Sequence, residues 1–341
     1  MSVDPTLHGY YLGIDTGATK THALITDRAG NVKAFLSGGP GNPQSIGGYR
    51  KLERLLSELT QKARDTAGIS LEDISAAGLG LAGYDWPSQK ERFYQIALST
   101  GLPEKTALVN DAGLGIYVGT TEGWGICVAA GTSFNCRGRG QDGREAFAIG
   151  DGMRWGEGAG ALELALKSAQ AVIAQYTMSG LETRLTDLFL EVFDAPNLAD
   201  LVEGIVLGRH RVTATLAPRI IEIAHQGDEA AKQTVLWASD CLAKLAKGAI
   251  RQLGLLGQPF EVVLSGNFFK AGEVIIKPLQ ESVLQLAPYA TFHILELPPV
   301  CGGALLAMEE DGGVTKEERK EIKNTLKLWF DQNPVGRVCQ C

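Results

Sequence analysis

At 341 residues the chain is long enough for two domains. Hydrophobic residues make up 45% and charged residues 21% of it, as in ordinary globular proteins, and no run of about 18 apolar residues predicts a membrane span. The net charge of −7 argues against nucleic-acid binding, which usually requires a basic surface, so neither a nucleic acid nor a membrane is an expected partner.

The first 121 residues alternate between strand and helix patterns. Three short apolar runs come first, and the polar turn between the second and third, Asp27–Asn31, has the composition of a hairpin turn. Leucines at helical spacing follow, and then an apolar strand, a helix and a strand. The expected strands are 10–14, 21–26, 32–36, 75–81 and 107–109, and the expected helices are 49–67 and 88–99.

The same order restarts after residue 121. Strands are expected at 125–130, 133–137 and 146–149, a long helical region at about 158–254, then strands at 261–264 and 291–295 with a helix at 268–286 between them. Two copies of one pattern predict an α/β protein with domains 1–121 and 122–314, whose sheets face each other across a cleft. A last helix at about 315–332 is expected to dock on the first domain.

The first candidate site is the turn that follows the first strand. Asp15 precedes Gly17, Thr19 and Lys20 there, and backbone N–H groups and hydroxyls in such a turn can face phosphate oxygens. Asp15 is placed to hold Mg²⁺ through water, because Mg²⁺ keeps much of its hydration shell. The alternative is a plain hairpin turn, in which the same residue types are common.

The second half offers a similar turn at the corresponding point. Gly131, Thr132 and Ser133 again lie between two strands, and two such turns could hold the phosphates from opposite sides of a cleft. Gly266 ends a later strand and opens a helix, where adenosine can pack against the backbone.

Asp111 lies between the two halves, where a strand ends and a helix of small residues begins. If its carboxylate faces the cleft, it can accept a proton from a sugar hydroxyl that attacks a phosphate. The alternative is an aspartate that caps the N-terminus of the helix.

These segments, taken in order, resemble the phosphate, adenosine and connecting motifs of the actin–hexokinase superfamily. Within it the chain is similar to the BadF/BadG/BcrA/BcrD ATPase family and to its N-acetylglucosamine kinase branch, over about residues 10–310. The most specific segments are Gly13–Thr21, Asn110–Gly113 and Ala130–Cys136. The resemblance implies two ribonuclease H-like domains, each with a mixed five-stranded sheet, and ATP with Mg²⁺ as cofactors.

The resemblance also implies roles for individual residues. Asp15 would lie beside the metal and the phosphates, Thr19 and Thr132 would contact ATP, Gly266 would lie against the nucleotide, and Asp111 would be the catalytic base. The residues at sugar-contact positions are Asn42, Phe134 and Asn135. A homodimer is implied by the same analogy.

One part of the family pattern differs in this chain. The family has an aspartate in a Gly-Asp-Glu-Gly-Ser segment that binds sugar hydroxyls, whereas this chain has Gly150 and Asp151 followed by Glu157. An ungapped alignment from Asn135 places Glu157 on that aspartate, and an alignment on the Glu-Gly pair places Gly156 there. We prefer Glu157, because a polar sugar needs paired hydrogen bonds.

Two other motifs were weighed and set aside. Gly78–Gly83 has the letters of a dinucleotide fingerprint, but no helix follows at once and the strand is the fourth, so close packing of this strand is expected instead. The Walker pattern is absent because the chain has no Gly-Lys dipeptide, and the five histidines show no metal-ligand spacing.

The N-terminus lacks the pattern of a secretory signal, and the six cysteines are scattered, so a reducing cytoplasm is the expected location. The prediction is an ATP-dependent kinase of an amino sugar such as N-acetylglucosamine. The alternatives are a kinase for another hexose or a muramic or glucosamine derivative, a non-catalytic sugar sensor, and an ATPase activator with an iron–sulfur cluster shared by a dimer. Neither the sugar nor a role for Cys339 and Cys341 can be deduced from the sequence.

Overall fold

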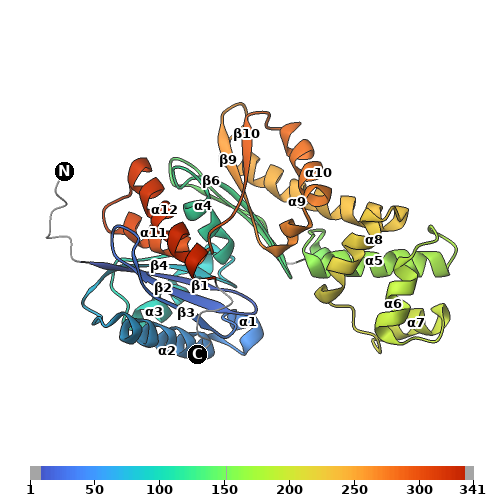
Figure 1. Ribbon diagram of the computed structural model, residues 1–341, viewed down its shortest axis with the longest axis horizontal. Coiled ribbons are helices and arrows are strands. Elements are labelled where there is room, and N and C mark those ends of the chain that lie inside the picture. The colour runs from blue at the N-terminus through green and yellow to red at the C-terminus, as the bar shows by residue number, and fades with distance from the viewer. Residues whose placement is uncertain (1–8, 151, 335–341) are drawn as a thin grey trace.

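The computed structural model describes residues 9–150 and 152–334 and contains two five-stranded mixed sheets (Figure 1). In the first, the order is β3-β2-β1-β4-β5; β1 pairs antiparallel with β2 and parallel with β4. Its strands are β1 (Tyr10–Thr16), β2 (Thr21–Thr26), β3 (Val32–Gly38), β4 (Ile74–Leu81) and β5 (Thr106–Val109).

The second sheet repeats this arrangement. Its order is β10-β9-β6-β7-β8, so β6 has the central place that β1 has in the first sheet. Its strands are β6 (Gly125–Ala130), β7 (Phe134–Arg139), β8 (Glu145–Phe147), β9 (Phe260–Ser265) and β10 (Ala290–Ile294). The predicted α/β architecture with two mixed sheets is therefore confirmed.

Helices cover both faces of the first sheet. The long helix α2 (Tyr49–Ala67) and α3 (Lys90–Ser99) bury their leucines and Phe93 against one face. The opposite face is covered by α11 (Val300–Glu310) and α12 (Lys316–Gln332), which pack with Tyr11 and Phe35 (Figure 1).

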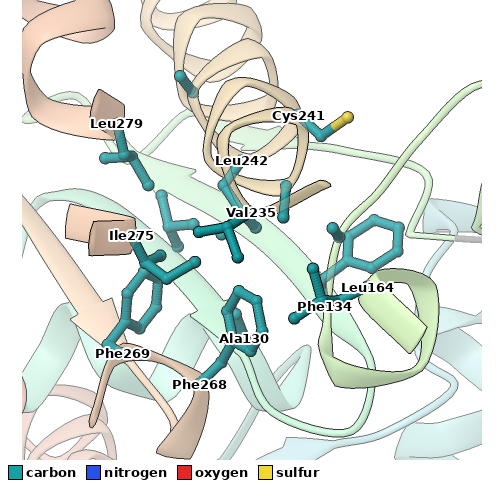
Figure 2. Packing of buried hydrophobic residues seen from close by; sticks show 14 of the residues in the cluster. Ala130, Phe134, Leu164, Val235, Cys241, Leu242, Phe268, Phe269, Ile275 and Leu279 are labelled. Carbon is teal, nitrogen blue, oxygen red and sulfur yellow. The ribbon is translucent and has the colours of Figure 1, made fainter. Parts of the chain in front are cut away.

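The second sheet packs one face against α9 (Glu229–Leu253) and α10 (Glu273–Leu284). Figure 2 shows Val235 and Leu242 of α9 in contact with a core that includes Ala130 and Phe134 at the end of the sheet nearest the cleft. On the other side lies the short helix α4 (Leu114–Gly119), which contacts β6, β9 and α11 and so stands between the two sheets.

The expected helical region, about 158–254, contains α9 and, before it, four shorter helices of the described chain. They lie to one side of the second sheet, away from the first (Figure 1). These helices are α5 (Ala161–Tyr176), α6 (Leu185–Phe193), α7 (Leu198–Val206) and α8 (Ala217–His225). Within residues 9–150 and 152–334, no helix has both the length and the apolarity to cross a bilayer.

Helix α11 packs against the first sheet although it follows the second in sequence. A Cβ on Gly303 would lie 2.7 Å from the carbonyl oxygen of Gly78, and one on Gly78 would lie 2.2 Å from that of Gly303. Gly78 is therefore needed for close packing of β4 on α11. We propose that the boundary of the second domain lies before residue 300, because a boundary at 314 assigns α11 to the sheet that it does not cover.

Candidate active site

A cavity of about 610 Å³ lies between the two sheets, where several strands end. Such a volume is typical of small-molecule sites. Its walls come from the β1–β2 turn, α1 (Pro43–Ile46), the loop after β4, the β6–β7 turn and the end of β9. The predicted site residues that line it are Asp15, Gly17, Thr19, Lys20, Asn42, Asp111, Gly131, Thr132, Ser133, Phe134, Asn135, Gly150 and Gly266.

The β1–β2 turn is tight and anchored at both ends. The backbone N–H of Gly17 donates to the carbonyl of Lys20 (2.8 Å), which closes the turn. The hydroxyl of the buried Thr16 accepts from the N–H of Ala82 (2.9 Å) and ties the turn to the loop after β4. Thr19 is exposed to the cavity, so its hydroxyl and backbone are available to a ligand.

The β6–β7 turn faces it from the other sheet. Gly131 donates to the carbonyl of Ser133 (2.8 Å), which closes this turn over one residue fewer than the first. The carbonyls of Gly131 and Thr132 accept from the first N–H groups of α5, at Ala161 and Leu162. Since the carbonyls are held by α5, the exposed Thr132 and Ser133 present hydroxyls and backbone to the cavity.

Asp111 lies at the start of a short 3-10 turn, Asp111–Gly113, that leads into α4. The residue that caps this turn is Asn110, whose side-chain oxygen accepts from the N–H of Ala112 (3.1 Å). The alternative role of Asp111 as the N-cap is therefore wrong. Its carboxylate is left at the cavity, near the N-terminal end of a helix.

Two acidic side chains that line the cavity, Asp15 and Asp111, have raised pKa values. Burial is the main cause that raises the pKa of Asp15 to about 7; the charge of Asp111 raises it further, and Lys20 lowers it. Burial likewise raises the pKa of Asp111 to about 6. The charge of Asp85 adds to that rise, while Arg137 and backbone hydrogen bonds oppose it. Two carboxylates that disfavour each other's charge are what a bound cation would relieve.

Polar side chains at one end of the cavity could hold an acceptor. Asn42 caps α1: its side-chain oxygen accepts from the N–H of Gln44 (2.9 Å), so its amide nitrogen is the group that remains for a ligand. Asn135 donates to the side-chain oxygen of Asn110 (3.3 Å), a link between β7 and the Asp111 turn.

Two predicted acceptor contacts are placed differently from the expectation. Phe134 lines the cavity, but its side chain is 4% exposed and lies in the core beside Leu164 (Figure 2), so it can reach a ligand only through its backbone. Glu157 is not among the described residues that line the cavity. Its carboxylate accepts from the N–H groups of Ile149 (3.0 Å) and Gly150 (2.6 Å), which braces the loop that carries Gly150. Asp151 lies outside the described residues.

Gly266 forms the part of the wall that follows β9. Its φ of +108° belongs to the region that favours glycine, and a Cβ there would lie 2.2 Å from the carbonyl oxygen of Ala130. The β9 loop therefore passes directly against the second turn.

Sequence reasoning missed the loop after β4. Asp85 and Trp86 line the cavity, and Asp85 forms an ion pair with Arg137 of β7 (3.0 Å) across the two halves. Asn110 also donates to Asp85 (3.0 Å), so this pair reaches the turn that carries Asp111. The sequence signal that could have found Asp85 and Trp86 is their position just after the carboxyl end of a buried parallel strand, where the ligand sites of open sheets lie.

The chain belongs to the BadF/BadG/BcrA/BcrD ATPase family, whose model matches residues 12–307. An N-acetylmuramic acid/N-acetylglucosamine kinase of Clostridium acetobutylicum is 27% identical to it over 260 residues, which are 76% of this chain and 85% of that protein. An N-acetyl-D-glucosamine kinase of Dictyostelium discoideum is 23% identical over 314 residues, 87% of this chain and 97% of that protein.

Solved structures confirm the actin–hexokinase type of fold. The ROK hexokinase from Thermus thermophilus is similar with a TM-score of 0.57 at 18% identity, over 88% of this chain and 98% of that one.

Proposed function

We propose that the protein is an ATP-dependent kinase that transfers the γ-phosphate of ATP to a hydroxyl of an amino sugar of the N-acetylglucosamine type. The observation that carries this proposal is the position of Asp111, whose carboxylate shares one cavity with two phosphate-type turns from opposite sheets. Two relatives named as kinases of N-acetylated amino sugars favour this acceptor class.

Asp111 is the general base in this proposal. Its raised pKa of about 6 is close to the operating pH, which suits a group that must be ionised and yet able to take a proton. The acceptor hydroxyl gives its proton to Asp111 as its oxygen attacks the γ-phosphorus, and the bond from that phosphorus to the bridging oxygen of ADP breaks.

The phosphates are oriented by the turns at Gly17–Thr19 and Gly131–Ser133, and Gly266 lies against the nucleotide. Asp15 fits a metal site, because it is an oxygen ligand whose charge is disfavoured by burial and by Asp111. Mg²⁺, when bound, would neutralise part of the charge of the phosphates. The amide groups of Asn42 and Asn135 and the backbone of Gly150 would orient the sugar, with Glu157 holding the Gly150 loop in place.

The activator alternative receives no support from the cysteines. The four cysteines in the described residues are all buried, and none lines the cavity. Cys339 and Cys341 lie outside the described residues. The homodimer and the cytoplasmic location stay predictions.

The test is ADP release from Mg·ATP in the presence of a panel of sugars that includes N-acetylglucosamine, N-acetylmuramic acid, glucosamine and glucose. We expect sugar-dependent release that falls by roughly 10²-fold or more in Asp111→Asn, as for a general base. Asp65→Asn, a change on the exposed surface of α2, is the matched control and should leave the rate unchanged. The kinase would be ruled out if wild type and Asp111→Asn both turned over ATP at the same rate with and without sugar.

A further inference from the structure

A second cavity adjoins the active site and has no role in the reaction described above. Its volume is about 380 Å³, and it lies between β5, the edge strand of the first sheet, and the β7–β8 hairpin of the second. Asp85 and Trp86 line both cavities, so the second one begins where the acceptor end of the first one stops. We call it the side cavity.

Aromatic side chains form much of its wall. They come from three separate parts of the chain: Tyr84 and Trp86 from the loop after β4, Tyr117 from α4, and Phe147 from β8. The Trp86 and Phe147 rings meet edge to face at 6.0 Å, yet the indole is 44% exposed. An exposed indole at the junction of two cavities keeps a large apolar surface in contact with water. A ligand that covers this surface would gain the free energy of removing it from water.

The charged groups of the side cavity are arranged to bind hydroxyls rather than an anion. Both of its arginines already pair with a carboxylate: Arg137 with Asp85 (3.0 Å) and Arg139 with Glu309 (2.9 Å). Lys90 and Glu145 also line it, and their opposite charges leave the wall without an excess of positive charge that would select an acid. Aromatic faces with paired, polar side chains at the rim suit a ring that is apolar on its faces and carries hydroxyls on its edge.

We propose that the side cavity is a second acceptor subsite, which takes a neutral pyranose ring linked to the sugar that is phosphorylated. The proposal rests on the proposed function, since it names the substrate class of the same site: a disaccharide of amino sugars, in addition to the monosaccharide. The ring would stack on the exposed indole of Trp86 with Phe147 at its edge, because the planes of the two aromatic rings are 77° apart, and the Asp85–Arg137 pair would contact its hydroxyls.

The test compares N-acetylglucosamine with its β-1,4-linked and β-1,3-linked dimers, in phosphorylation and in calorimetric binding. Two variants change the side cavity at residues that do not line the active-site cavity. Phe147→Leu keeps an apolar side chain but removes the ring, and Leu108→Trp fills the cavity from the β5 side.

For wild type, we expect at least one dimer to bind and to be phosphorylated. Either variant should weaken binding of that dimer by about tenfold, the effect of roughly one lost aromatic contact. Binding of the monosaccharide should change by less than about twofold. Thermal melting identifies a variant that has not folded, and the other variant then gives the result.

Two outcomes would overturn the proposal. One is that neither dimer binds the wild-type protein. The other is that the variants weaken the binding of monosaccharide and dimer equally. Failure of the proposed function is distinguishable: phosphorylation of no sugar rejects the kinase, while calorimetry still reports whether a dimer binds and whether binding depends on Phe147.

Discussion

At the scale of single residues, the active-site cavity contains carboxylates whose charged form lowers the stability of the folded protein. The pKa of Asp15 is raised from 3.8, its ordinary value, to about 7. Between about pH 4 and 7 the folded protein therefore keeps a proton that the unfolded chain has lost, so the free energy of unfolding from this group falls as the pH rises through that window. Without ligand, Asp15 is expected to destabilise the protein at neutral pH.

Asp15→Asn is accordingly expected to raise the melting temperature of the ligand-free protein at about pH 8, and to abolish phosphoryl transfer. The gain should be roughly 2–4 °C, the shift expected for about one kcal/mol in a large domain. Asp73→Asn is a control of opposite sign: its exposed carboxylate accepts from the N–H (2.7 Å) and hydroxyl (2.8 Å) of Ser70, which lowers its pKa, so its loss should not stabilise. A melting temperature for Asp15→Asn at or below wild type would contradict this.

The pH profile of the reaction provides a second prediction at this scale. Because Asp15 and Asp111 must both be ionised, kcat/KM is expected to fall as the pH drops below about 7, the raised pKa of Asp15, and more steeply below about 6, the value to which burial raises the pKa of Asp111. Asp85→Asn removes a charge that raises this pKa and frees Arg137, which lowers it. The acid limb of the profile should therefore move to lower pH in that variant. An unchanged limb would mean that another group controls it.

At the scale of elements, the position of the β9 loop depends on one glycine. Gly266→Ala is expected to destabilise the protein and to weaken ATP binding, because its Cβ would meet the carbonyl of Ala130 and its φ is positive. Gly272→Ala is the matched control: it shares a positive φ (+75°) but has no heavy atom within 4 Å of the added Cβ. Denaturant unfolding and nucleotide titration of both variants separate the close contact from backbone strain. Equal losses would assign the effect to strain alone.

Most elements of this fold could be predicted from the sequence, since apolar runs and turn chemistry are local signals. The succession of strands and helices along the chain and the paired turns at Gly17 and Gly131 followed from the repeat of one pattern. Helix α11 was assigned to the second domain, because the sequence does not reveal which sheet a helix of small residues covers. That depends on glycines of β1 and β4 that are distant in sequence, such as Gly78.

The candidate site was predicted less evenly. Residues in turns between strands were found because Asp, Gly and Thr stand out there. The cap role of Asn110 and the brace formed by Glu157 were missed, because each depends on which backbone N–H a side chain reaches in three dimensions. The Asp85–Arg137 pair joins residues 52 positions apart and has no local signal.

At the scale of the whole molecule, an ionic cluster around the buried Arg319 joins helices of the first sheet to a strand of the second. Glu309 of α11 pairs with Arg139 of β7 (2.9 Å) and with Arg319 of α12. Arg319 is 1% exposed and also donates to the carbonyl of Tyr117 in α4 (2.6 Å). Helix α12 is thus attached through one guanidinium to both helices that stand between the sheets.

Arg319→Ala is therefore expected to lower the free energy of unfolding by about 1.5–3 kcal/mol, the usual cost of losing hydrogen bonds to a charged group, because Glu309 keeps its pair with Arg139. The exposed pair of Arg209 with Asp200 (3.1 Å) supplies the control, since Arg209→Ala should cost less than about 1 kcal/mol. Urea unfolding of both variants measures the difference. If this cost reflects the loss of one of the two partners of Glu309 rather than lost packing of α12, the double variant Arg319→Met with Glu309→Gln should recover part of the stability. A double variant as unstable as Arg319→Ala would instead show that α12 is held by the shape and bonds of the arginine itself, with the ion pair contributing little.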